Sequence, residues 1–267
     1  MLLILTLSLI LLLQESGGSG SESVKASYWC PGKCQLSNAG LCHNNYLFII
    51  GTGRSGSTSI FKALNQVPGI HLCGETGVLP AFRDLYEAAA AEQHTALLED
   101  QQSLFAMLHP PSRNNLMKKP GGEAPLILGS KEVHVPMELL DFVLRLFPCS
   151  RFIFSYRLDL VAQGNSGFHQ KEAAVGGQQG REDKRLRLAA ETDKMIRMHT
   201  TLGPFQTFLL PLEHLKQPTR LAALLAWLGF QEDCQLLQVG HYNFNNTYRK
   251  IKAWPRVRGS CRHSGTR

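Results

Sequence analysis

Residues 46–64 read YLFIIGTGRSGSTSIFKAL and divide into three parts. The first part, Tyr46–Ile50, is an apolar run that ends at Gly51, as a buried parallel strand does. The last part, Ser57–Leu64, predicts a helix that is closed by the Pro-Gly pair shortly after it. A glycine-rich turn between a strand and a helix brings backbone N–H groups and the helix N-terminus around one point. The segment therefore predicts a phosphate-binding loop.

The side chains of this loop suit an anion but not nucleotide hydrolysis. Ser57 and Thr58 can donate hydroxyl hydrogen bonds, and Arg54 can neutralise negative charge. In the hydrolysing pattern GxxxxGK[ST] the two glycines fit, but Ser57 stands where the lysine is required. No apolar strand that ends in a magnesium-binding Asp follows. A kinase or an ATPase is therefore disfavoured.

The rest of the chain alternates strand and helix patterns. Of the 267 residues 43% are hydrophobic and 18% are charged, which suits one compact domain and excludes a disordered or fibrous chain. The alternation predicts an α/β fold with a P-loop-like, mostly parallel sheet flanked by helices. Further strands are predicted at 70–73, 126–128, 151–156 and 207–210, helices at 79–98, 137–146, 182–198 and 221–228, and long loops at 101–122 and 164–180.

The loop at residues 51–58 resembles the first cofactor loop of sulfotransferases, in which a strand is followed by G-x-x-[RK]-[ST]-G-[ST]-T and a helix. The resemblance implies the sulfotransferase fold and an enzyme that uses 3′-phosphoadenosine-5′-phosphosulfate (PAPS) as co-substrate without a metal. The reaction would move a sulfuryl group to a hydroxyl or amine of an acceptor. We expect a carbohydrate acceptor and no nucleic-acid partner. The resemblance also implies the residues that hold the 5′-phosphosulfate: Arg54, Ser55, Gly56, Ser57 and Thr58.

A second segment resembles the family's 3′-phosphate element, a strand that ends in Arg with a Ser about two turns later. Residues 151–157, RFIFSYR, match its first half. Arg157 would then hold the 3′-phosphate together with Ser166, or with Asn165, which stands at the usual serine position. In the alternative reading, Arg157 is an ordinary ion-pair partner of Asp159.

Two more segments resemble the family. Residues 207–230 resemble a scaffold element made of a strand, an E-x-L turn and a helix. Tyr248-Arg249-Lys250 resembles the Arg-Lys-Gly loop that closes over the cofactor in cytosolic sulfotransferases, with Ile251 in place of the glycine. The resemblance therefore gives Arg249 and Lys250 as cofactor contacts.

Sulfuryl transfer needs a base for the acceptor's proton and a cation at the bridging oxygen of the leaving phosphate. Glu75 follows the second strand, where some carbohydrate sulfotransferases have a glutamate base. His134 lies in KEVHVP, residues 131–136, which resembles the Lys-x-His-x-Pro segment of cytosolic members with one residue inserted. Lys131 would then be the cation. We expect Glu75 to be the base, with His134 or Glu132 as alternatives.

The N-terminal region predicts a secreted or anchored protein. Residues 2–13 are apolar except for Thr6 and Ser8, and a Gly/Ser run follows. This stretch is short for a membrane span, which needs about 20 apolar residues. We expect residues 1–15 to be a signal peptide or short signal anchor, 16–45 a linker and cysteine-containing stem, and 46–267 the sulfotransferase domain with a basic tail.

Cysteines and a glycosylation sequon favour the same compartment. Three of the seven cysteines, Cys30, Cys34 and Cys42, cluster behind the Gly/Ser run and predict disulfide bonds in an oxidising lumen. Their spacing is not the paired CxxC pattern of a zinc site, so we expect no metal. Asn245-Asn246-Thr247 is an N-glycosylation sequon. These features predict the secretory pathway, either anchored in the Golgi lumen or secreted.

Two other functions stay open at this stage. A P-loop kinase or NTPase that has exchanged its lysine would bind ATP with magnesium. A non-enzymatic secreted protein would bind acidic glycans through the tail, since residues 248–267 hold seven basic residues and no acid, equal to the whole net charge of +7.

Overall fold

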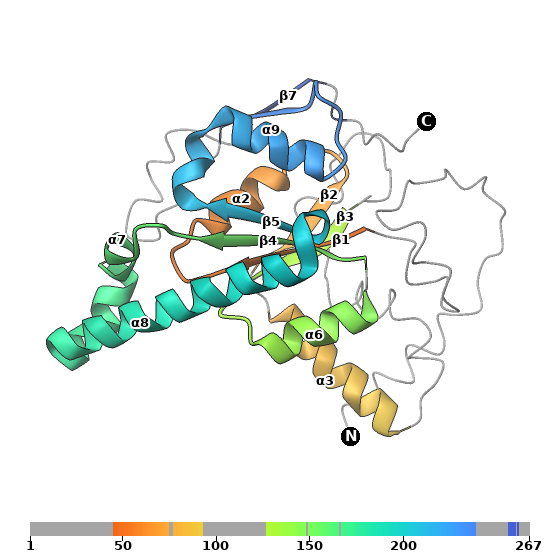
Figure 1. Ribbon diagram of the computed structural model, residues 1–267. Coiled ribbons are helices and arrows are strands. Elements are labelled where there is room, and N and C mark those ends of the chain that lie inside the picture. The colour runs from red at the N-terminus through yellow and green to blue at the C-terminus, as the bar shows by residue number, and fades with distance from the viewer. Residues whose placement is uncertain are drawn as a thin grey trace.

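The computed structural model describes residues 45–74, 77–92, 127–147, 149–165, 167–238, 256–259 and 261. Its centre is a five-stranded sheet in the order β2-β3-β1-β4-β5, in which all neighbouring strands are parallel (Figure 1). The predicted α/β class with a parallel sheet is thereby confirmed. The strands are β1 (Asn45–Gly51), β2 (Ile70–Cys73), β3 (Ile127–Val133), β4 (Arg151–Tyr156) and β5 (Thr207–Pro211).

Helices cover both faces of the sheet because β1 is apolar on both of its faces. Leu47 and Ile49 pack into the cluster formed with α2 and α9, whereas Phe48 and Ile50 pack into the cluster formed with α3, α6 and α8. Successive side chains of a strand point to opposite faces, so this continuous apolar run needs cover on both sides. The helices are α2 (Ser57–Leu64), α3 (Val78–Ala91), α6 (Met137–Leu146), α7 (Leu160–Gly164), α8 (Gly167–Gln206) and α9 (Pro218–Trp227), with a 3₁₀ helix η3 (Leu212–Lys216).

A small C-terminal ladder packs beside α9. Strands β6 (Gln235–Gln238) and β7 (Arg256–Arg258) pair antiparallel, and a disulfide joins Cys234 to Cys261 across 27 residues of sequence. Closing a loop of that length in the unfolded chain contributes about 3.5 kcal/mol in the chain-entropy account. The predicted disulfide cluster at Cys30, Cys34 and Cys42 lies outside the described residues.

Two segments differ from the sequence-based prediction. The predicted loop 164–180 is wrong, because α7 reaches Gly164 and α8 begins at Gly167. Its glycines each lower helix stability by about 1 kcal/mol, but no proline interrupts the segment, and it continues into a helix that packs on β4 and β5. Strand β3 also extends past Leu128 to Val133, through polar residues that the apolar pattern did not mark. The predicted loop 101–122 lies outside the described residues.

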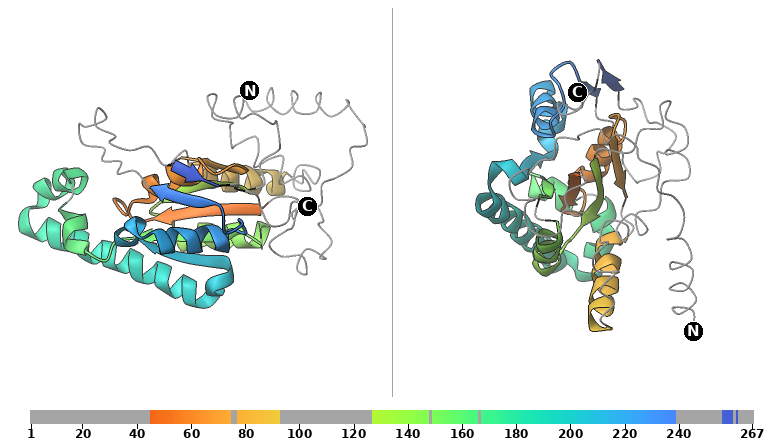
Figure 2. Two further views of the ribbon diagram at one scale, coloured as in Figure 1. Left: turned by 90° about the horizontal axis from the view of Figure 1, so that it is seen from above. Right: turned by 90° about the vertical axis from the view of Figure 1, so that its right-hand side faces the viewer.

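Helix α8 has an unusual position. In Figure 2 it runs along the sheet, and its first part extends past the carboxyl ends of the strands, beside α7. These carboxyl ends are the edge at which open parallel sheets bind ligands. The loop at residues 52–56 and the residues that follow β3 and β4 all lie along this edge.

Candidate active site

The loop at residues 52–56 leaves β1 and enters α2 through two left-handed residues. Arg54 has φ 65° and Gly56, the N-cap of α2, has φ 87°. A side chain at Gly56 would be strained by this φ, and its Cβ would also lie 2.5 Å from Leu212 Cδ1. The N–H of Ser55 donates to the Thr52 carbonyl at 3.1 Å and closes the turn. The loop therefore has one defined shape, which the glycine permits.

Residues of β4 and α7 hold this loop in place. Gln163 of α7 is fully buried, and its Nε2 donates to Thr52 Oγ1 at 2.8 Å and to the Gly53 carbonyl at 2.6 Å. Ser155 Oγ donates to the Ser55 carbonyl at 3.0 Å, and the N–H of Thr52 donates to the Ser155 carbonyl at 3.2 Å. The two predicted cofactor elements thus form one hydrogen-bonded unit. Gln163 lies inside the second element but was not predicted as a site residue.

The donors of the loop fit a phosphate or sulfate group. The N–H groups at the start of any helix have no hydrogen-bond acceptor within the helix. In α2 these groups belong to Ser57 and its neighbours. The first turn of α2 carries no acidic residue. Within the described part of the chain, Ser55 Oγ is buried and has no hydrogen-bond partner. An oxyanion at this point would satisfy these donors, so the residues fit the group that the resemblance implies.

Lys131 brings a cation to the same loop from the neighbouring strand. It lies at the position of β3 that pairs with Ile49, it is buried, and its Nζ donates to Thr58 Oγ1 at 3.3 Å. Burial lowers the pKa of Lys131 to about 8, although the charge of Glu132 acts in the opposite direction. A bound anion would favour the charged ammonium further.

Glu132 points away from Lys131 because adjacent residues of a strand face opposite sides. It faces α3, where the backbone of Leu79 contributes a hydrogen bond, and its Oε1 is buried without a partner among the described residues. Burial raises the pKa of Glu132 to about 7, against the opposing effects of Ser130, Lys131 and Leu79. This carboxyl is therefore on the opposite face of the sheet from the Lys131–Thr58 contact.

His134 lies directly at the start of the loop. It follows β3 with φ 54°, and its N–H donates to the Gly51 carbonyl at 3.1 Å. Its Nδ1 lies 2.9 Å from Glu191 Oε2 and 3.0 Å from Glu191 Oε1. Glu191 comes from α8 and was not predicted. Glu75, which we expected to be the base, lies outside the described residues.

Arg157 follows β4 at the same edge. Its Nε lies 3.9 Å from Glu213 Oε1, while the Glu213 carboxylate also accepts the N–H groups of Leu158 and Asp159. Asp159 Oδ1 accepts the N–H of Ala162 at 2.8 Å and caps α7. The partner of Arg157 is therefore Glu213, in place of the Asp159 of the alternative interpretation.

Of the other predicted cofactor contacts, Asn165 is the C-cap of α7. Ser166, Arg249 and Lys250 lie outside the described residues, so their roles stay predictions.

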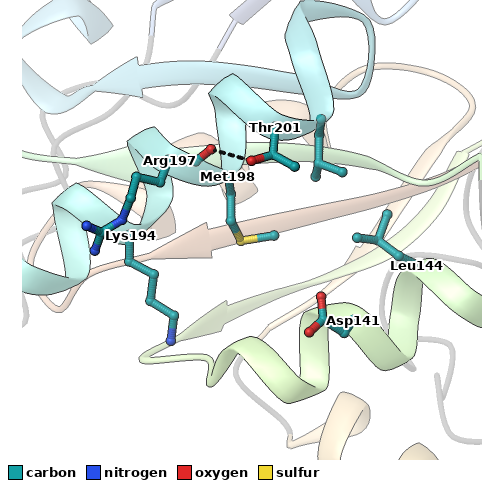
Figure 3. Close-up of a pocket in the computed structure, with 7 residues that line it drawn as sticks. Asp141, Leu144, Lys194, Arg197, Met198 and Thr201 are labelled. Carbon is teal, nitrogen blue, oxygen red and sulfur yellow. Dashed lines mark hydrogen bonds between the residues drawn. The ribbon is translucent and has the colours of Figure 1, made fainter.

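A separate pocket of about 400 Å³ lies between α6 and α8 (Figure 3). Its apolar lining is Leu144, Met198 and Leu202, and its polar lining is Asp141, Lys194, Arg197 and Thr201. The Arg197 guanidinium is paired with Asp193 at 2.8 Å. None of the predicted site residues lines this pocket, so it is distinct from the loop and strand-end site.

The solved structures that are similar to this chain include two sulfotransferase domains. A sulfotransferase domain from the curacin biosynthetic pathway is 19% identical, with a TM-score of 0.47, and the match covers 69% of this chain and 74% of that chain. A sulfotransferase domain from the Synechococcus PCC 7002 olefin synthase is 17% identical, with a TM-score of 0.43, and the match covers 70% and 74%. No curated protein matches the chain.

The predicted secretory location is unsupported by these comparisons. The two solved domains belong to a biosynthetic pathway and an olefin synthase. Among the residues that the structure describes, no helix has the length and apolar character to cross a membrane. The Golgi, signal, glycoprotein and membrane assignments that belong to this prediction are likewise unsupported.

The family match agrees with the position of the site. The model of the sulfotransferase family matches residues 47–231, which is more than half of the 267 residues. This range holds the loop, Lys131, His134 and Arg157, and extends from β1 through α9. The chain belongs to the sulfotransferase family.

Proposed function

We propose that this sulfotransferase moves a sulfuryl group from PAPS to a hydroxyl or amine of an acceptor, with carbohydrates as the first acceptor class to test. One observation carries the proposal. The loop has Ser57 at the position that lysine occupies in nucleotide-hydrolysing loops. The cation beside the loop is instead Lys131 of β3, whose Nζ donates to Thr58 Oγ1. The buried Ser55 hydroxyl, whose Oγ has no partner among the described residues, supports an oxyanion at this point.

The two ends of the co-substrate would be held by different elements. The loop and the first turn of α2 would hold the 5′-phosphosulfate through N–H groups and the hydroxyls of Ser57 and Thr58. Arg157, at the end of β4, would hold the 3′-phosphate, with Glu213 orienting its guanidinium. Gln163 links the two elements, so both sites would keep a fixed separation.

Bound PAPS would supply the sulfuryl group, whose bond to the phosphate oxygen breaks as the acceptor oxygen or nitrogen attacks sulfur, and the bonding pair leaves with that phosphate oxygen. Lys131 would stabilise the negative charge that grows there. His134 would take the acceptor's proton. We choose His134 because its backbone bonds to Gly51 at the entry to the loop. Glu75 remains the alternative base.

Transfer of labelled sulfate tests this function. PAPS carrying radiolabelled sulfur is incubated with the full chain and with separate glycosaminoglycans, simple glycans, tyrosine peptides, phenols and amines. We expect label to move to at least one class without added magnesium. Lys131→Met should abolish the transfer, whereas Lys194→Met, a lysine outside the site, should not. Absence of transfer to every class, with no binding of PAPS, would contradict the proposal.

A further inference from the structure

Glu191 of α8 is the unpredicted residue that contacts His134. We propose that Glu191 is a positioning residue, whose carboxylate accepts a hydrogen bond from His134 Nδ1–H and so leaves Nε2 unprotonated for the acceptor's proton. The inference rests on the proposed function, because it assigns the group that orients the base. It goes beyond that function by drawing α8 into the active site.

The contact joins two elements that are remote in sequence. Both carboxylate oxygens of Glu191 lie within 3.0 Å of His134 Nδ1, across 57 residues of the chain. The His134 backbone is itself fixed by a left-handed φ of 54° and by its bond to the Gly51 carbonyl. Non-glycine residues rarely adopt this conformation, because the Cβ atom then crowds the backbone. The fold therefore fixes both the backbone and one ring nitrogen of His134.

Charged neighbours favour an ionised Glu191. Burial alone would raise its pKa, but the hydrogen bond from His134, the charge of His134 whenever that ring is protonated, and the charges of Arg187 and Lys184 leave the pKa of Glu191 below its ordinary value. Arg187 Nε lies 3.8 Å from Glu191 Oε1, one turn away on the same helix. A carboxylate is an acceptor only, so it selects the histidine tautomer that carries its proton on Nδ1.

A plain surface ion pair is the competing explanation. Helix α8 has such pairs, for example Arg185 with Glu182 and Arg197 with Asp193, and each joins residues one turn apart on exposed helix surface. Glu191 differs because it contacts His134, which follows β3 and whose N–H bonds to Gly51 at the edge of the phosphate loop. Its side chain is also only 24% exposed. Glu182 therefore provides a matched control, since Glu182→Gln makes the same change in the same helix without touching His134.

The test reads the tautomer of His134 directly. The full chain is labelled with ¹⁵N, and two-bond ¹H–¹⁵N correlations are recorded at a pH where neutral imidazoles dominate, with His134→Asn assigning the signal. We expect the Nδ1–H tautomer to exceed the Nε2–H tautomer about tenfold or more in the wild type. Glu191→Gln should reduce this excess, and Glu182→Gln should preserve it. An equal tautomer ratio in the wild type and Glu191→Gln would overturn the inference.

Kinetics give the second readout, using the first acceptor that the labelling screen identifies. Glu191→Gln should lower kcat by about tenfold or more relative to Glu182→Gln, with unchanged affinity for 3′-phosphoadenosine-5′-phosphate. A structural role alone would lower stability or nucleotide affinity and leave kcat alike in both variants, which would also overturn the inference. A failure of the proposed function would give a different result: the wild type would not bind the nucleotide, whatever its tautomer ratio.

Discussion

Gln163 of α7 donates two hydrogen bonds to the phosphate loop, so its replacement tests whether the two cofactor elements act as one unit. Gln163→Leu nearly preserves side-chain size but removes both donated hydrogen bonds, to Thr52 Oγ1 and to the Gly53 carbonyl. Each neutral hydrogen bond contributes about 1 kcal/mol, and removing a partner from a buried polar group costs about 1–3 kcal/mol. Gln163 and Thr52 are both fully buried, so water cannot replace these bonds without rearrangement.

The expected loss of stability is therefore about 2–4 kcal/mol. For a domain of this size the melting temperature changes by about 2–4 °C per kcal/mol, which gives a fall of roughly 4–16 °C. The loop should also lose its fixed shape, and the affinity for 3′-phosphoadenosine-5′-phosphate should fall about tenfold or more. Thermal unfolding without ligand, and isothermal titration of the nucleotide at a temperature where the variant is folded, measure the two effects separately.

Gln179→Leu is the matched control. Gln179 also donates a side-chain hydrogen bond, at 2.8 Å to Asp183, but on the exposed surface of α8. Its replacement should change the melting temperature and nucleotide affinity little. If Gln163→Leu unfolds at the same temperature as Gln179→Leu and binds the nucleotide as the wild type does, the argument for a coupled loop is wrong.

Three further predictions follow from the site. Arg157→Ala should weaken nucleotide binding by about 1.5–3 kcal/mol, whereas Arg54→Ala should lower turnover as well; equal nucleotide affinity in Arg157→Ala and the wild type, measured by titration, would show that the second element is misplaced. His134→Asn should lower turnover about 100-fold or more with nearly intact nucleotide affinity, and Glu75→Gln should cost far less; the reverse order in sulfate transfer would make Glu75 the base. Burial raises the pKa of Glu132 from 4.5 to about 7 in the folded protein. Between these pH values the folded state holds a proton on Glu132 that the unfolded state has lost. The free energy of unfolding should therefore fall as pH rises through this range, by on the order of 3 kcal/mol. Urea unfolding across this range should show that Glu132→Gln lacks the fall, and an equal fall in both proteins would refute the assignment.

The sheet and the loop could be predicted from the sequence because the patterns that indicate them lie within short stretches of the chain. The apolar run before Gly51 and the Gly-Ser turn after it are contiguous, so a strand, a turn and a helix could be read directly. The helix Met137–Leu146 and the strand Arg151–Tyr156 also match their predicted bounds. The end of β3 could not be read in this way, since Lys131 and Glu132 are buried only because β3 lies between β1 and β2.

The supporting residues of the site could not be predicted, because their partners are remote in sequence. Gln163 contacts Gly53 across 110 residues, and Glu191 contacts His134 across 57. Gln163 lies next to the segment 164–180 that was predicted to be a loop, so no helix was expected beside it. Glu191 lies within the predicted helix 182–198, but nothing in the sequence indicates that this helix reaches the residue that follows β3. A side chain that only positions another residue is not part of a recognisable sequence motif. The residues that are expected to contact phosphate do form such a motif.

The central claim is that the loop binds a phosphorylated sulfuryl donor without metal, and ligand-dependent thermal stability tests it most directly. At a hundredfold excess over its dissociation constant, 3′-phosphoadenosine-5′-phosphate should stabilise the fold by about 2.7 kcal/mol, which raises the melting temperature by roughly 5–11 °C without magnesium. ATP with magnesium should raise it far less, because Ser57 replaces the lysine of the nucleotide-hydrolysing loop. A strong magnesium-dependent response to ATP, together with no response to 3′-phosphoadenosine-5′-phosphate, would contradict the account.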